Sequence, residues 1–123
     1  MTKPRILAVD DQSENLGLIV EILKADYSVI ATTSPLKAFE LAQKEPRPAV
    51  ILLDVTMPEM DGFAVLQQLK SQAELSAIPV IFVTGGNDEA DYEKGFSLGA
   101  ADFVTKPISP ALLKNRVRRC VNA

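Results

Sequence analysis

The chain has 123 residues, and its 13 Lys and Arg against 16 Asp and Glu give a net charge of −3. This length suits one domain of the usual size, about 100–150 residues, and a composition 47% hydrophobic and 24% charged is that of a globular protein. With no His and one Cys, the sequence excludes His-based catalysis, a disulfide framework and a thiolate zinc site.

The cellular setting is also limited by the sequence. Its apolar runs are far shorter than the roughly 20 residues that cross a membrane, and the first residues lack the pattern of a signal peptide. The mildly acidic balance argues against direct binding of nucleic acid by this segment. We therefore expect a cytoplasmic protein without a membrane partner.

Short apolar runs alternate with longer amphipathic segments along the chain. The short runs predict strands buried on both faces of a parallel sheet, at residues 5–9, 27–32, 49–53, 79–83 and 102–104. Helices are predicted between them, with Ser34 and Ser109 as N-caps before proline and Gly99 as a left-handed C-terminal cap. Gly62, at the start of the third helix, indicates either a positive φ or close packing.

Five such strand–helix units predict an α/β fold that forms one domain over residues 1–123. Right-handed crossovers and the need to cover both faces favour a five-stranded parallel sheet of order 2-1-3-4-5, doubly wound (flavodoxin-like) with five helices. In such sheets ligands bind beyond the carboxyl ends of the strands, near the switch between strands 1 and 3.

Polar side chains follow four of the predicted strands. They are Asp10 and Asp11 after the first, Asp54 after the third, Thr84 after the fourth and Lys106 after the fifth. Each alone is an ordinary cap, turn residue or solvated charge, but three carboxylates at one rim repel each other by about 1–4 kcal/mol per pair. A dication or an ammonium group would remove this repulsion, so the rim is predicted to be a cation site.

All-oxygen ligands without His or Cys suit Mg²⁺. A carboxylate beside Mg²⁺, a lysine and a threonine hydroxyl is also a suitable site for a covalent phosphoryl group, since the cations offset the charge on its oxygens. From this chemistry, an aspartyl phosphate formed with Mg²⁺ is one interpretation of the rim.

The motifs at these positions resemble the receiver domain of two-component response regulators. They are Val9-Asp10-Asp11, the run from Leu53 to Gly62 (LDVTMPEMDG), Val83-Thr84 and Phe103-Val104-Thr105-Lys106-Pro107, in the order and spacing of that family. The resemblance implies that Asp54 accepts a phosphoryl group from a histidine kinase or phosphotransfer protein. It also implies that Asp11, Asp54 and the backbone carbonyl of Thr56 ligate Mg²⁺, with Asp10 holding the metal through water.

The resemblance assigns further roles near the fourth and fifth strands. Lys106 would pair with Asp54 and the phosphoryl group, Thr84 would turn its hydroxyl toward phosphate, and Phe103 would be the switch aromatic residue. A cis bond is expected before Pro107. The implied function is a regulatory switch rather than an enzyme, in which phosphorylation shifts the face formed by helix 4, strand 5 and helix 5. A phosphorylation-linked dimer is allowed, and the output domain or downstream protein is not specified by the sequence.

Three other interpretations share parts of this pattern. A haloacid-dehalogenase-like phosphatase needs a second aspartate where this chain has Thr56, and an FMN carrier needs a Ser/Thr-rich loop after the first strand. A pseudo-receiver used only for protein binding would not need all five site residues. Gly85-Gly86 departs from the family, and we expect Gly86 to leave the water path to the phosphoryl group open.

Overall fold

The computed structural model describes residues 3–85 and 89–122. Its five strands form one parallel sheet in the order β2-β1-β3-β4-β5, as predicted. The strands are β1 (Arg5–Val9), β2 (Ser28–Thr32), β3 (Val50–Asp54), β4 (Val80–Thr84) and β5 (Asp102–Thr105). The predicted strands were therefore right to within one residue at each end.

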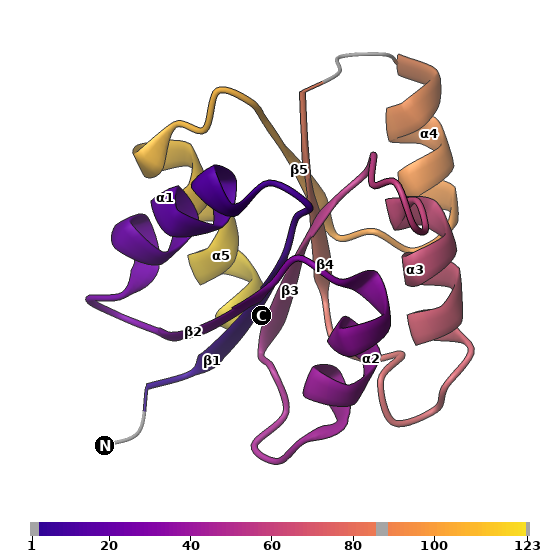
Figure 1. The fold of residues 1–123 in the computed structure, drawn as a ribbon, viewed down its shortest axis with the longest axis horizontal. Helices are drawn as coiled ribbons and strands as arrows, with labels where there is room; N and C mark the ends of the chain where they lie inside the picture. Colours follow the sequence, from indigo (N-terminus) through magenta and orange to yellow (C-terminus); the bar gives the residue numbers. More distant parts are fainter. Residues whose placement is uncertain (1–2, 86–88, 123) are drawn as a thin grey trace.

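One helix follows each strand, and the helices cover both faces of the sheet (Figure 1). They are α1 (Ser13–Leu23), α2 (Pro35–Gln43), α3 (Gly62–Lys70), α4 (Glu89–Ser97) and α5 (Pro110–Val121). Helices α1 and α5 lie on one face, while α2, α3 and α4 lie on the other. None of the described helices combines the length and apolar character needed to cross a bilayer.

Two separate cores result from the alternation of side chains along each strand. In β1, Ile6 and Ala8 face α1 and α5, whereas Leu7 and Val9 face the opposite helices. All four are at most 2% exposed. The predicted continuous apolar strands are explained by this arrangement, because every position of a strand covered on both faces is buried.

The predicted helix ends are confirmed where the structure shows cap geometry. The Ser34 hydroxyl accepts a hydrogen bond from the Lys37 amide, and the Ser109 hydroxyl accepts one from the Leu112 amide. Gly99 has a φ of 107°, which favours glycine. A third cap was not predicted: the Asp61 carboxylate accepts a 2.9 Å hydrogen bond from Ala64 N and starts α3 beside the rim.

Gly62 shapes the loop that follows β3. Its φ is not positive, but an added Cβ would overlap the backbone oxygen of Asp54 and lie 2.9 Å from the Phe82 ring. Gly62 N also donates a 2.7 Å hydrogen bond to Val55 O. Of the two alternatives, close packing is therefore correct, and it fixes the backbone next to Asp54.

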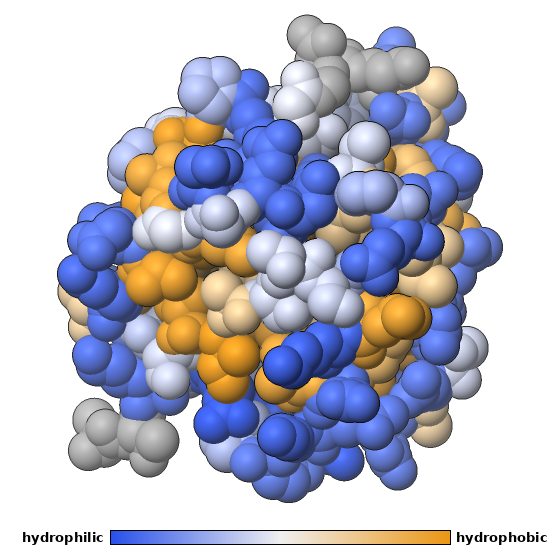
Figure 2. All heavy atoms as spheres, in the orientation of Figure 1, coloured by the Kyte–Doolittle hydropathy of each residue, from blue (hydrophilic) through white to orange (hydrophobic). Residues whose placement is uncertain are grey.

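The face seen in Figure 2 is largely hydrophilic, with apolar residues between the polar ones. Three large apolar side chains in the described part are well exposed: Leu18, Leu36 and Phe96. They belong to α1, α2 and α4, so they are distributed over both layers of helices.

Candidate functional site: an acidic hollow at the carboxyl ends of the strands

The loops after β1, β3 and β4 surround a hollow of about 490 Å³, which we call the Asp54 hollow. It is lined by Asp11, Gln12, Asp54, Thr56, Thr84, Gly85, Asp91 and Lys106. Asp10 is 1% exposed at the end of β1, within ligand-sharing distance of Asp11 and Asp54. The parallel strands bring these residues together because their carboxyl ends share one edge of the sheet.

The three acids form a compact cluster. Each offers a carboxylate oxygen, and these atoms all lie within 4.8 Å of one another. Asp54 is 6% exposed, whereas Asp11 is exposed to solvent. The cluster predicted from the strand ends is therefore present, with Asp10 and Asp54 buried and Asp11 exposed to solvent.

Lys106 is the cation of the site. Its Nζ lies 3.1 Å from Asp10 Oδ2 and 3.6 Å from Asp54 Oδ1, so it contacts both buried acids. Its backbone amide donates a 2.8 Å hydrogen bond to Thr84 O, which ties the chain after β5 to the end of β4. The Lys106–Pro107 bond is cis, as expected, and the Glu45–Pro46 bond, for which no prediction was made, is also cis.

Backbone amides orient the two buried carboxylates. Gln12 N donates to Asp10 Oδ1 at 2.9 Å, and Thr56 N donates to Asp54 Oδ1 at 3.4 Å. Each amide lies two residues after its aspartate, the local pattern of an Asx turn. The loops therefore orient one oxygen of each carboxylate through the backbone, in addition to the contacts that the Lys106 side chain makes.

The surroundings of Asp54 raise its pKa to about 6. Burial is the main cause and the nearby charge of Asp10 is the next, with a smaller contribution from Asp11. Lys106 and the Thr56 amide act in the opposite direction. Asp54 is thus a carboxylate whose negative charge is only partly compensated by the protein.

The donor set fits a hard divalent cation such as Mg²⁺. The oxygen Asp10 Oδ2 is buried and, despite its ion contact with Lys106, has no hydrogen-bond partner among the described residues. Carboxylate oxygens and waters are the ligands that Mg²⁺ prefers. The single ammonium of Lys106 offsets only part of the charge of three neighbouring carboxylates, and such an ion would offset the remainder.

Thr84 and Phe103 occupy different parts of the structure. Thr84 ends β4, is 7% exposed and lines the Asp54 hollow. Phe103 packs away from this hollow, with ring centroids 4.7 Å from Tyr92 and 5.1 Å from Phe96 of α4. It also lies 5.3 Å from the ring of Phe82 in β4. The sequence-predicted residues are thus brought together at the hollow, except for Phe103, which joins β5 to α4.

Three lining residues were not predicted. Gln12 and Gly85 directly follow residues that were identified, so proximity in the chain was the available signal. Asp91 lies in the first turn of α4, and no local motif connects it with the strand ends. Gly86, for which an effect on water access was expected, lies outside the described residues.

The parallel sheet covered by helices on both faces, with an acidic hollow at the carboxyl ends of its strands, defines a doubly wound α/β domain, and sequence comparison gives the family. Residues 6–118 match the response regulator receiver domain family, and the chain belongs to it. It is 42% identical over 112 residues to the "Probable cyclic di-GMP phosphodiesterase" of Vibrio cholerae, covering 91% of this chain and 25% of that protein. It is 40% identical over 114 residues to response regulator PleD of Caulobacter vibrioides, covering 93% and 25%. The chain thus spans about a quarter of the length of these two relatives.

Solved structures show the same fold. The chemotaxis protein CheY4 of Vibrio cholerae superposes with a TM-score of 0.90 at 28% identity, covering 97% of this chain and 99% of that one. The receiver domain of a sensor histidine kinase from Pseudomonas aeruginosa superposes with a TM-score of 0.89 at 25% identity, covering 99% of this chain and 100% of that one. That structure has a magnesium ion coordinated in its active site cleft.

Proposed function

We propose that this receiver domain is a phosphorylation-dependent switch in which Asp54 accepts a phosphoryl group. The observation that carries the proposal is the geometry around Asp54: a hollow open to solvent, a lysine 3.6 Å from its carboxylate, and two further acids that need a cation. Family membership supports the same function.

The chemical step is a transfer from a phosphorylated histidine of a kinase or phosphotransfer protein. An oxygen of the Asp54 carboxylate attacks the phosphorus, a P–O bond forms, and the P–N bond breaks with its electron pair left on the donor imidazole. Lys106 offsets charge on the phosphoryl oxygens, and the Thr84 hydroxyl donates a hydrogen bond to one of them. The product is an acyl phosphate on Asp54.

The metal site in this proposal uses Asp11, Asp54 and the backbone carbonyl of Thr56, with Asp10 acting through water. When bound, Mg²⁺ offsets the negative charge of the acids and of the phosphoryl oxygens. The three carboxylates within 4.8 Å of one another and the magnesium ion in the Pseudomonas aeruginosa receiver domain support this assignment.

The test is covalent labelling followed by intact mass. Acetyl phosphate or phosphoramidate with Mg²⁺ should add one phosphoryl group to the wild-type protein and none to Asp54→Asn. Asp61→Asn is the matched control, because Asp61 is a nearby exposed acid whose cap on α3 an asparagine can replace. Undiminished labelling of Asp54→Asn would place the acceptor elsewhere.

Phosphorylation is proposed to shift the face formed by α4, β5 and α5. The contacts of Phe103 with Tyr92 and Phe96 support this, because any movement of the ring has to be accommodated by α4. Ligand contacts move such an equilibrium only by their difference in energy between the two states. Beryllofluoride with Mg²⁺ should therefore perturb the NMR signals of α4 and β5, and changes confined to the loops beside Asp54 would contradict the coupling.

The same proposal covers organisation and partners. Residues 1–123 would form a single regulatory domain whose own chemistry is limited to gaining and losing the phosphoryl group. Its partners would be a histidine kinase or phosphotransfer protein and an output domain or downstream protein, with a phosphorylation-linked dimer as a further assembly. The location in the cytoplasm and the absence of membrane or nucleic-acid binding by this domain stay predictions from the sequence.

A further inference from the structure

A second hollow lies at the amino-terminal ends of the strands, where β4 and β5 begin and α5 ends. This α5 hollow has a volume of about 430 Å³ and is lined by Ala77, Pro79, Ala101, Asp102, Arg119 and Cys120. Its volume falls in the range of small-molecule sites, about 300–1,000 Å³. Because Pro79 precedes β4 and Asp102 begins β5, the α5 hollow is separated from the Asp54 hollow by the length of the strands.

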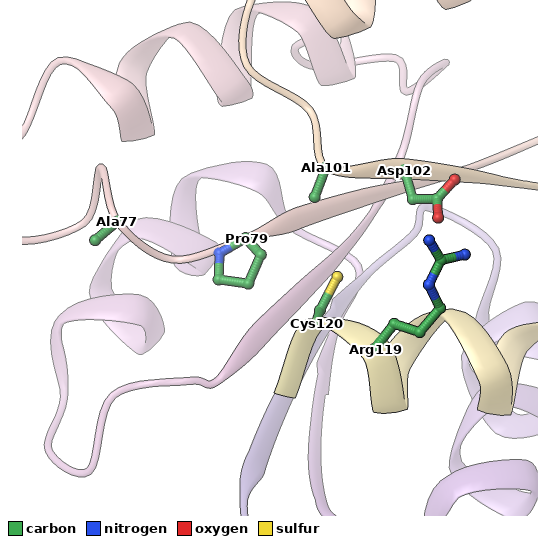
Figure 3. A pocket seen from close by; sticks show the side chains of 6 residues that line it. All are labelled: Ala77, Pro79, Ala101, Asp102, Arg119 and Cys120. Carbon is green, nitrogen blue, oxygen red and sulfur yellow. The ribbon is translucent and has the colours of Figure 1, made fainter. Parts of the chain in front are cut away.

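Apolar groups from three segments form its walls. Pro79 and Ala101 come from the starts of two adjacent strands, which a 2.8 Å hydrogen bond from Ala101 N to Val80 O holds together. Cys120 comes from the last turn of α5. Figure 3 shows the Cys120 sulfur and the Arg119 guanidinium on the helix, both directed toward the strand side of the hollow.

Asp102 and Arg119, the two charged residues that line the α5 hollow, form no ion pair with each other. Asp102 Oδ1 accepts a 2.9 Å hydrogen bond from Phe103 N, and Asp102 Oδ2 lies 3.3 Å from Arg116 Nε. Both oxygens of this acid are thus engaged by other groups. Within residues 3–85 and 89–122, the Arg119 guanidinium has neither an acidic partner within ion-pair distance nor a hydrogen-bond acceptor. The Arg119 guanidinium, which is exposed to solvent and directed toward Asp102 in Figure 3, is therefore available to a further anion at the mouth of the hollow.

We propose that the α5 hollow binds a small organic acid, with its carboxylate on Arg119 and its apolar body against Pro79, Ala101 and Cys120. The planar guanidinium pairs with a carboxylate through two parallel hydrogen bonds. The apolar walls select an acid with a hydrocarbon or aromatic body over a bare inorganic anion, because only the former removes apolar surface from water. This site is independent of phosphoryl transfer at Asp54.

Cys120 supplies a direct readout, because it is the one cysteine of the chain and lines the hollow. The experiment measures the rate at which iodoacetamide alkylates Cys120, by intact mass, at increasing concentrations of 3-phenylpropanoate. A ligand that covers the sulfur slows the reaction by one plus the ratio of ligand concentration to Kd, roughly tenfold at ten times Kd. Amide NMR shifts at Ala77 and Ala101 should report the same Kd.

Two matched variants separate the site from general charge effects. Arg119→Gln should weaken binding by roughly 10- to 100-fold, the usual effect of losing hydrogen bonds to a charged group. Arg118→Gln should leave Kd within about twofold. Arg118 does not line the hollow, and its charge instead lowers the pKa of Tyr27. Each variant is compared with and without the acid, because Arg119 itself influences the reactivity of the neighbouring thiol.

Comparison ligands complete the test. The neutral 3-phenylpropanamide should protect Cys120 at least about tenfold less than the acid, because it lacks the charge that Arg119 recognises. Equal protection by the amide, or an equal loss of binding in both arginine variants, would overturn the proposal. Protection by acetate as strong as that by the aromatic acid would reduce the site to a nonspecific anion contact and would also overturn it.

Discussion

Replacing Asp54 by asparagine is expected to stabilise the metal-free protein at neutral pH. The pKa of Asp54 is raised to about 6 from the ordinary 3.8, so ionising this carboxyl is less favourable in the folded protein than in the unfolded chain. The pKa difference corresponds to a loss of about 3 kcal/mol in the free energy of unfolding when Asp54 is ionised. Water that reaches the open hollow screens the charge and reduces this loss to about 1–2 kcal/mol. The Asn side chain keeps the size of the aspartate and removes the charge.

The pH dependence has a definite sign. As pH rises from about 4 to about 6, the unfolded chain loses its Asp54 proton first, so the folded state binds more protons and the stability of the wild type falls. The stability of Asp54→Asn does not fall in this way, because the variant has no carboxyl group to ionise. Its free energy of unfolding should equal that of the wild type below about pH 4 and exceed it by about 1–2 kcal/mol above about pH 7.

Urea denaturation followed by circular dichroism, in a chelating buffer across this pH range, measures the difference. Asp26→Asn is the control, because Asp26 is an exposed aspartate outside the Asp54 hollow. Saturating Mg²⁺ should remove or reverse the advantage by stabilising the wild type. A gain that is the same at acidic and neutral pH, or that Asp26→Asn also shows, would refute the electrostatic explanation.

The other predictions concern packing, metal and charge. Gly95→Ala should be less stable than Gly17→Ala by about 1–3 kcal/mol in chemical denaturation, because a Cβ at Gly95 would lie 2.5 Å from an aromatic ring of β5 while Gly17 has open space. Asp11→Ala should remove most of the rise in Tm that Mg²⁺ causes in the wild type, and an equal rise would mean that the ion binds elsewhere. Lys106→Met should raise the pKa of Asp54 above its present value, seen by carbon NMR of the carboxyl group, because Lys106 now lowers it. An unchanged titration would show that the ammonium group does not act on Asp54.

The fold was predictable because two strong patterns agree in this chain. Uninterrupted apolar runs such as the one in β3 identify buried parallel strands, and the Ser34-Pro35 and Ser109-Pro110 pairs mark helix starts. The cap by Asp61 was missed because the same residue belongs to the loop motif after β3. The sequence also left the role of Gly62 open, since overlap with the backbone of Asp54 depends on how the loop folds back.

The candidate site was predictable where strand ends determine position. The sheet order brings Asp10, Asp54 and Thr84 to the carboxyl ends of the strands, where Asp54 and Thr84 line the hollow and Asp10 lies beside Asp54. Two features depend on three-dimensional packing instead. Asp91 reaches the hollow from α4, and Lys106 approaches Asp10 more closely than Asp54, at 3.1 Å against 3.6 Å.

The two cores also differ in their aromatic content. All five phenylalanines pack on the side of α2, α3 and α4, whereas the buried core under α1 and α5 is aliphatic. The chain has no tryptophan, and its two tyrosines are divided between these sides: Tyr27 packs against the aliphatic core and Tyr92 contacts Phe103. Each side of the sheet therefore contains one fluorescent tyrosine. In Tyr92→Phe the fluorescence of Tyr27 would report on the α1 and α5 side, and in Tyr27→Phe that of Tyr92 would report on the α4 side.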